Sequence, residues 1–340
     1  MLKYLKFDNR YLLAYVIFVL MFIGIRYTSD WNGYQKFLET PELCPDLLFR
    51  FIAEYVHGKI EFSTIYKAHI FLMGGVYLLL IRRTVDCPAI AILYAVDIYL
   101  FMANQIRFYL AWPIMLLAIF SFYKKEFIIF AILAILSILS HKSVILLLPC
   151  AFLCNFFLRR MCFEKAICLL FGISLVVGLF SWHDFGSGFG LRQLHYYQQI
   201  SKSATITGLF FAQLPYLTCL ALIISIHRSI SKITPNVLDD LIYRYLLVLS
   251  LVPILFIGFS FYVTVFSQRF SLSMILIWFM YFYWSYCKYA NRKQREGIVV
   301  VAAVVFFINP FFACFYALYK GNYFHCMEIF TMLHSYSLLL

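Results

Sequence analysis

Residues 104–149 read NQIRFYLAWPIMLLAIFSFYKKEFIIFAILAILSILSHKSVILLLP, and they decide the fold. Two apolar stretches dominate this segment, separated by a Lys-Lys-Glu turn at 124–126. Small polar clusters, Gln105 to Arg107 and His141 to Ser143, interrupt the apolar sequence near its ends. Ionisable side chains inside membrane sequence are costly and mark functional sites by default. We therefore expect a membrane protein whose reaction site, at one face of the bilayer, uses these two clusters.

The composition extends this interpretation to all 340 residues. Hydrophobic residues make up 64% of the chain and charged residues 13%, and several apolar windows reach the length of a transmembrane helix. The formal net charge of +12 would suggest nucleic acid in a soluble protein. Here the lysines and arginines cluster in short loops between apolar runs, as cytoplasmic loops do. The fold class is therefore all-α, a polytopic integral membrane protein, and nucleic acid is not expected as a partner.

Placing the basic clusters inside the cell predicts about 11 to 12 transmembrane helices in a single domain, 1–340. We expect the N-terminal apolar run to stay as the first helix. The predicted spans are 8–26, 68–81, 87–103, 107–123, two arms within 127–158, 164–181, 206–227, 240–260, 271–287 and 297–317. Residues 27–67 are predicted to form an external amphipathic segment, and 182–205 an external, periplasmic loop. The tail, 323–340, is either a last span or an interfacial helix.

Segment 127–158 is predicted to be a hairpin, because the basic pairs at its two ends, 124–125 and 159–160, both belong inside. Each arm has about 15 residues and is about 22 Å long, which is shorter than a hydrocarbon core of about 30 Å. We therefore expect the polar tip, 141–143, to lie below the outer surface in a water-filled depression.

Five side chains near the outer ends of these spans are candidates for chemistry. Arg107 either binds a phosphate through two hydrogen bonds or snorkels to the interface. Asp97 either acts in catalysis or pairs with Arg107 or Lys142. His141 is a candidate general base, since an unperturbed imidazole has a pKa of about 6.5. Lys142 and Ser143 beside it are candidates for phosphate or sugar contacts; alternatively, His141 and Ser143 only cap the hairpin turn.

Further candidates lie in the other external segments. Asp30 follows the first span and either contacts a glycan or anchors the chain at the interface. Loop 182–205 contains Arg192 among glycines and tyrosines, which suits either a sugar-binding surface or a flexible spacer. Gln268 and Arg269 begin the tenth span and again place a lone arginine at its outer end.

Metal and disulfide chemistry are not expected. The ten cysteines form no Cys-x-x-Cys pair and are interpreted as buried small hydrophobes. No acidic cluster suggests a divalent cation.

Four motifs together resemble the EpsG family, Wzy-like polymerases of bacterial O-antigens and exopolysaccharides. They are Asp30-x-x-x-Tyr34, Asn104-x-x-Arg107-x-x-x-Ala111, His141-x-Ser143 followed by an apolar run to Pro149, and Gln268-Arg269-Phe270-Ser271. The similarity of organisation covers roughly 25–285, most of the chain.

The resemblance implies a glycosyltransferase reaction on the periplasmic side of the bacterial inner membrane. A growing glycan would move from undecaprenyl diphosphate to the non-reducing end of the next lipid-linked repeat unit, without a nucleotide cofactor. A chain-length regulator protein is a further implied partner. His141 or Asp30 would be the catalytic base. The substrate-binding set would comprise Arg107, Arg269, Arg192, Lys142, Gln105, Gln268, Ser143 and Asp97.

Two other function classes are compatible with the residues. A transporter or flippase of lipid-linked oligosaccharides would place charges along a translocation path, but would be expected to contain inverted repeats, which this sequence lacks. An O-antigen ligase or membrane acyltransferase is the other alternative, and a ligase would be expected to have a larger external loop.

Overall fold

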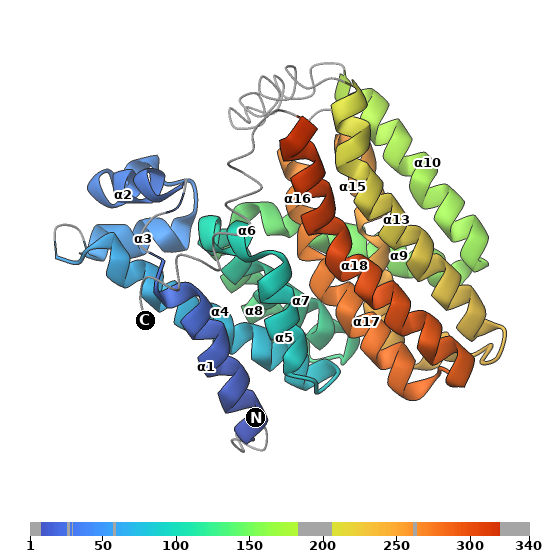
Figure 1. The fold of residues 1–340 in the computed structure, drawn as a ribbon. Helices are drawn as coiled ribbons and strands as arrows, with labels where there is room; N and C mark the ends of the chain where they lie inside the picture. Colours follow the sequence, from blue (N-terminus) through green and yellow to red (C-terminus); the bar gives the residue numbers. More distant parts are fainter. Residues whose placement is uncertain are drawn as a thin grey trace. The chain divides into compact units, whose positions relative to one another are not determined.

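The computed structural model describes residues 8–25, 28, 30–56, 59–182, 206–260 and 264–319. Every regular element in these ranges is an α-helix or a short 3-10 helix, so the predicted all-α class is confirmed (Figure 1). The chain divides into two compact units. Unit 1 comprises 1–168, 236–252 and 272–284, and unit 2 comprises 169–235, 253–271 and 285–340.

Unit 1 contains both polar clusters singled out in the sequence. Its helices are α1 (Asn9–Ile23), α2 (Trp31–Glu39), η2 (Pro41–Leu43), α3 (Leu47–Val56), α4 (Phe62–Thr84), α5 (Ala89–Asp97), α6 (Tyr99–Asn104), α7 (Ile106–Tyr123), α8 (Phe127–Ser140), η3 (Lys142–Leu146), α9 (Leu147–Arg160), η4 (Val237–Asp239), α14 (Leu241–Leu251) and most of α17 (Ile275–Lys288).

The central helix of unit 1 is α7, which packs against α4 and α8. It is apolar on all sides, as a helix enclosed by other helices should be, and nearly all its side chains are buried. Two hydroxyl groups from other helices donate hydrogen bonds to its backbone carbonyls. Ser137 Oγ lies 2.7 Å from the carbonyl oxygen of Ala111, and Tyr245 Oη lies 2.9 Å from that of Leu116.

The segment predicted to be a hairpin folds as α8, η3 and α9, with 14 residues in each α-helix; that both of its ends lie inside the cell stays a prediction. It follows α7 through a turn in which Lys125 has a φ of 64°. The Glu126 N–H donates to the Ser121 carbonyl at 2.9 Å, which is the Schellman arrangement that ends a helix. At the other end of α8, His141 is extended, with a φ of −158°, and the chain then turns into η3.

Several predicted spans are interrupted. Span 87–103 is divided at Ile98 into α5 and α6, and span 240–260 at Val252 into α14 and α15 (Pro253–Ser260). Pro253 accounts for the second break because proline has no backbone N–H to continue the helical ladder. Helix α4 begins at Phe62, within the segment predicted to be external, and α16 (Thr264–Ser273) begins before the predicted start of the tenth span at 271.

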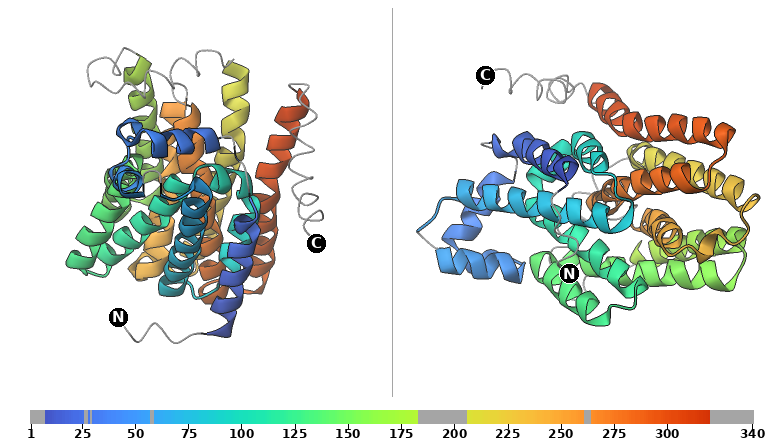
Figure 2. Two further views of the ribbon diagram at one scale, coloured as in Figure 1. Left: turned by 90° about the vertical axis from the view of Figure 1, so that its left-hand side faces the viewer. Right: turned by 90° about the horizontal axis from the view of Figure 1, so that it is seen from below.

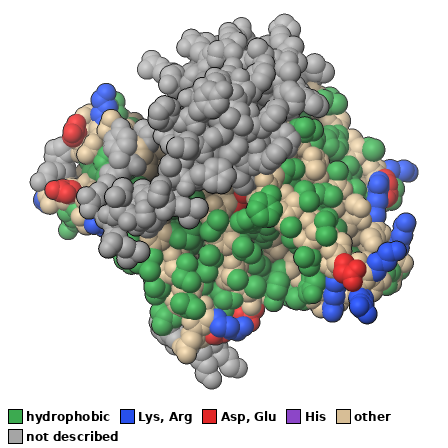
Figure 3. Space-filling model, viewed as in Figure 1, with side chains coloured by type: hydrophobic (Ala, Val, Ile, Leu, Met, Phe, Trp, Pro, Cys, Tyr) green, Lys and Arg blue, Asp and Glu red, His purple; other side chains and the backbone are tan. Residues whose placement is uncertain are grey.

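The polar contacts of unit 1 lie at its two opposite ends. At one end, Tyr11 Oη donates to Asp86 Oδ1 at 2.7 Å, and Arg83 pairs with Glu126 at 3.1 Å. At the other end lie the α6–α7 junction and η3. Helices α1 and α4 lie side by side between the two ends (Figure 2). Exposed hydrophobic side chains cover the outer face of α1, while Lys and Arg appear where α1 begins (Figure 3).

Unit 2 contains most of α10 (Phe163–Trp182), α13 (Ile206–Ser231), α15, most of α16, the end of α17 and α18 (Arg292–Tyr319). Ser174 Oγ accepts a hydrogen bond from Gly258 N–H at 2.7 Å, which joins α10 to α15. Gln294 Nε2 donates to Ser229 Oγ at 2.8 Å, which joins α18 to the end of α13. These contacts hold helices that are distant in sequence together within the unit.

Within the described residues, six helical stretches are long and apolar enough to cross a membrane: 62–84, 106–123, 142–160, 213–231, 241–258 and 269–288. Helices α1 and α8 are apolar but shorter. The chain is therefore a multi-pass membrane protein, as predicted. The finer number of about 11 to 12 crossings stays a prediction.

Candidate functional site

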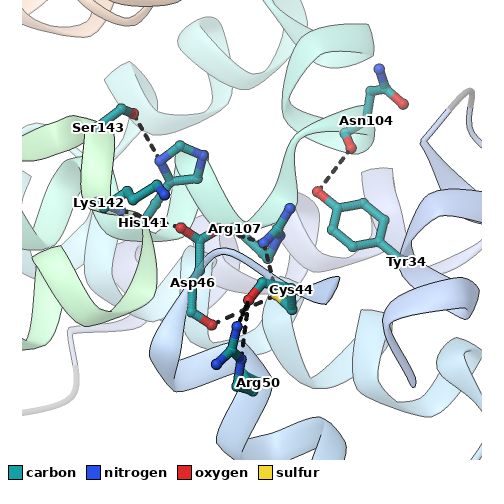
Figure 4. Close-up of polar contacts among 9 residues, drawn as sticks. All are labelled: Tyr34, Cys44, Asp46, Arg50, Asn104, Arg107, His141, Lys142 and Ser143. Atoms are coloured by element: carbon teal, nitrogen blue, oxygen red, sulfur yellow. Dashed lines mark hydrogen bonds and ion pairs between the residues drawn. The ribbon is translucent and has the colours of Figure 1, made fainter. Parts of the chain in front are cut away.

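Arg107, the second residue of α7, forms the centre of the site (Figure 4). Its Nη1 makes an ion pair with Oδ2 of Asp46 and lies 3.3 Å from Sγ of Cys44. The Arg107 side chain is 13% exposed and the Asp46 side chain 2% exposed. A buried ion pair that is also hydrogen-bonded resists separation, because removal of either partner leaves an uncompensated charge.

Three aromatic rings surround the Arg107 guanidinium. Its central carbon lies 5.1 Å from the ring centroid of Tyr34, 5.0 Å from that of Phe37 and 5.3 Å from that of Phe49. Tyr34 and Phe37 come from α2, and Phe49 comes from α3. Cation–π attraction contributes about 0.5 to 2 kcal/mol per ring, more when the cation is desolvated. Helices α2 and α3 therefore both contact the arginine.

Asp46 connects Arg107 to the tip of the hairpin. While Oδ2 pairs with Arg107, Oδ1 accepts a hydrogen bond from the backbone N–H of Lys142 at 3.3 Å. That N–H belongs to the first residue of η3, where the backbone donors of a helix have no partner within the helix. One buried carboxylate thus binds both α7 and the turn between α8 and α9.

His141 and Ser143 contact each other at this turn. His141 Nδ1 lies 2.8 Å from Ser143 Oγ, and the imidazole ring packs edge-on against Phe108 with centroids 5.4 Å apart. The Ser143 hydroxyl can donate to Nδ1 of a neutral imidazole or accept from the Nδ1–H of an imidazolium. A neutral imidazole protonated on Nδ1 also donates to Ser143, and it keeps Nε2 as the basic nitrogen, which suits a general base.

Arg50 holds the loop that carries Asp46. Its Nη2 donates to the carbonyl of Glu42 at 2.8 Å and to that of Cys44 at 2.9 Å. These carbonyls end the 3-10 helix η2, so the Arg50 side chain provides the donors that the helix lacks. Burial raises the pKa of the Cys44 thiol above its ordinary value, which keeps the sulfur neutral beside the ion pair at physiological pH.

The α6–α7 junction lies beside the cluster. Asn104 Oδ1 accepts the backbone N–H of Asp30 at 2.7 Å, and the Asn104 carbonyl accepts the Tyr34 hydroxyl at 3.3 Å. In the part of the chain that the structure describes, Oε1 of Gln105 is buried without a hydrogen-bond partner. A buried polar atom of this kind costs about 1 to 3 kcal/mol, so the junction is suited to a ligand that donates a hydrogen bond.

The structure brings together most of the predicted site residues of unit 1. His141, Lys142, Ser143 and Arg107 are linked directly or through Asp46, and Asp30 is linked through Asn104. Asp97 ends α5, half-buried, immediately before the break at Ile98.

The remaining predicted residues lie elsewhere. Gln268 and Arg269 belong to α16 in unit 2. Arg192, with nearly all of loop 182–205, lies outside the described residues. Their roles in binding substrate stay predictions.

Asp46 is the residue that sequence reasoning missed. The local signal is Pro45-Asp46 followed by the apolar run Leu47-Leu48-Phe49, since a proline and an aspartate just before a periodic apolar segment are typical of a helix start. That signal locates the start of α3. It does not indicate that the carboxylate folds back onto α7.

The comparisons with known proteins identify a family. The search of curated proteins and the search of solved structures each found no match. A family model described as the EpsG family matches residues 9–329, nearly the whole chain. The chain therefore belongs to the EpsG family, which is associated with Wzy-type polymerases, as the four sequence motifs had suggested.

Proposed function

We propose that this polysaccharide polymerase-like membrane protein polymerises a bacterial surface glycan, an O-antigen or an exopolysaccharide. The donor is the growing glycan on undecaprenyl diphosphate. The acceptor is a hydroxyl at the non-reducing end of the next lipid-linked repeat unit. The observation that carries the proposal is a cluster at one end of unit 1 that contains Arg107, His141 and Ser143, each predicted from sequence. Asp46 pairs with Arg107 and accepts the backbone N–H of Lys142, which lies between the contacting His141 and Ser143.

The reaction requires a base for the acceptor and cations for the leaving group. The acceptor hydroxyl gives its proton to His141 and forms the new glycosidic bond, while the bond between the sugar and the lipid diphosphate breaks. The proton is taken up on Nε2, while Ser143 Oγ accepts the Nδ1–H that the imidazole carries both before and after this transfer. The electron pair of the broken bond leaves with undecaprenyl diphosphate, whose growing negative charge is stabilised by Arg107. Arg269, Arg192 and Lys142 are proposed as further contacts to the diphosphate or the glycan.

The site is proposed to face the periplasm across the bacterial inner membrane. Arg82, Arg83, Lys124 and Lys125 are near the end of unit 1 that is joined by the Arg83–Glu126 pair, and such clusters favour the cytoplasmic side. The Arg107 cluster is at the opposite end. The lipid-linked repeat units, the bilayer itself and a chain-length regulator are the proposed partners.

The first experiment is deletion of the gene from the source bacterium, followed by its restoration on a plasmid. Surface polysaccharide is then separated on a gel. Collapse of a long ladder to a single repeat unit, reversed on restoration, supports the polymerase. An unchanged ladder contradicts it, and so does the loss of every band, which is expected of a flippase or ligase defect.

Variants then test the residues. His141→Ala should reduce polymer synthesis by at least about 100-fold, the typical contribution of a general base, with normal amounts of protein in the membrane. Ser143→Ala should lower synthesis to a smaller extent. Ser140→Ala is the matched control, because the Ser140 hydroxyl donates only to the carbonyl of Leu136 in its own helix, at 2.8 Å. Normal activity of the His141 variant would exclude it as the base.

A further inference from the structure

We propose that Asp46 is the positioning residue of this site, holding the phosphate-binding arginine and the histidine turn in one fixed relation. The inference rests on the proposed function and adds a residue that the sequence motifs did not include. Asp46 is 2% exposed, so it acts through its protein partners rather than on substrate. Its two oxygens bind different elements, α7 and η3.

The carboxylate determines which edge of the Arg107 guanidinium faces a ligand. Nη1 is engaged by Asp46 and by the sulfur of Cys44. Nε is buried and has no hydrogen-bond partner among the described residues. With the rings of Tyr34, Phe37 and Phe49 close to the guanidinium, rotation is restricted. The remaining edge of the guanidinium is the one formed by Nε and Nη2. A diphosphate oxygen is the acceptor that fits this edge, because guanidinium N–H groups bind phosphate in a planar arrangement.

The other oxygen determines where the histidine turn begins. By accepting the Lys142 N–H, Oδ1 fixes the first residue of η3. Lys142 lies between His141 and Ser143, whose side chains contact each other. Displacement of this backbone therefore moves the base and its hydroxyl partner together. Asp46 thus couples the position of the base to the position of the cation.

The predicted kinetic effect is on turnover rather than on substrate binding. Asp46→Asn keeps the size of the side chain but loses the charge that orients Arg107. Small displacements of reacting groups reduce rates by up to about 100-fold, so we expect kcat to fall about 10- to 100-fold. KM for the lipid-linked unit should stay within about threefold, since Arg107 remains able to bind phosphate. Asp46→Glu restores the carboxylate and should recover at least half of the loss on a logarithmic scale.

A second pair of variants isolates the backbone hydrogen bond. Lys142→Pro removes the N–H that Asp46 accepts, at the first position of a helix where proline is tolerated. Lys142→Ala removes the side-chain charge but keeps that N–H. We expect kcat of the proline variant to be about 10-fold below that of the alanine variant, a loss typical of one hydrogen bond to a charged group. Equal kcat values would show that the hydrogen bond to Asp46 has no role in positioning.

The assay uses the full-length protein in native membranes, with lipid-linked repeat units from the deletion strain as substrate. Glu126→Gln is the matched control, because it removes a carboxylate from an ion pair at the opposite end of unit 1; its kcat should be unchanged. A wild-type kcat for Asp46→Asn, or a raised KM with unchanged kcat, would overturn the positioning role of Asp46. Neither result would contradict the proposed polymerase function. Absence of polymerisation by the wild-type protein would instead contradict the proposed function.

Discussion

Replacing Asp46 with Leu removes the carboxylate that neutralises Arg107 while keeping a branched side chain with the same number of heavy atoms. Because the two side chains are 2% and 13% exposed, the remaining guanidinium would be buried among aromatic rings without its counter-ion. Breaking a buried pair in this way costs about 3 to 5 kcal/mol of folding free energy. Arg107→Met should cost a similar amount, because it leaves the Asp46 carboxylate buried without its cation.

The double variant Asp46→Leu, Arg107→Met decides whether this loss comes from the pair. Replacing both charges with apolar groups is often close to neutral, so we expect the double variant to lose no more than about 2 kcal/mol. The two substitutions should therefore be strongly non-additive, with a coupling energy of at least about 4 kcal/mol. The double variant would be stable but inactive, which separates the role of the pair in folding from its role in catalysis.

The assay is reversible unfolding of the purified protein in mixed micelles with increasing denaturing detergent, followed by tryptophan fluorescence. Glu126→Leu provides the comparison, since the Glu126 side chain is 32% exposed and its partner Arg83 16% exposed; this more solvated pair should be worth about 1 kcal/mol. If each single variant loses less than about 1 kcal/mol, or if the losses simply add, the buried coupling between Asp46 and Arg107 is refuted.

Three further predictions concern packing, thiol chemistry and topology. Gly74→Ala should destabilise the α1–α4 contact by about 1 to 3 kcal/mol, because its Cβ would lie 3.0 Å from a ring atom of Phe18 in α1. The control is Gly75→Ala, whose Cβ meets nothing within 4 Å. It should be neutral or stabilising in the same unfolding assay. Burial raises the pKa of the Cys44 thiol above the ordinary thiol pKa of 9.0, so little thiolate forms below that pH. Labelling of Cys44 by maleimide should therefore be slow at neutral pH. Rapid labelling of the folded protein would contradict the burial of this thiol. In a background without reactive native cysteines, Glu39→Cys should react with an impermeant thiol reagent added from the periplasm. Lys125→Cys should react only after the cells are opened. The reverse pattern would show that the proposed orientation of the protein in the membrane is inverted.

The helical spans were predictable because they depend on local sequence. Runs of apolar residues set the lengths of α7 and α8, and the basic pair at 124–125 identified the turn between them. The break at Val252 could be inferred from Pro253. The break at Ile98 has no comparable signal, because neither proline nor glycine occurs there and tertiary packing decides where α5 ends.

The site was only partly predictable, for a different physical reason. Arg107 and His141 stand out because each is an ionisable residue in apolar sequence. Asp46 lies in a segment that already contains several charges and prolines, so its local sequence marks it as ordinary. Its importance arises from contacts with Arg107 and Lys142, which are 61 and 96 residues away in the chain. Such proximity is a property of the fold that residue patterns in one sequence do not reveal.

The separation of these residues along the chain also determines the order in which the site can be assembled during synthesis. Asp46 leaves the ribosome before α4, α7 and the hairpin, and it has no partner until those helices have entered the bilayer. The ion pair with Arg107 can form once α7 has been made, whereas the Lys142 N–H can reach the carboxylate only after α8 has been made. A chain whose hairpin fails to insert would therefore keep the ion pair with Arg107 but leave Oδ1 of Asp46 without the Lys142 N–H.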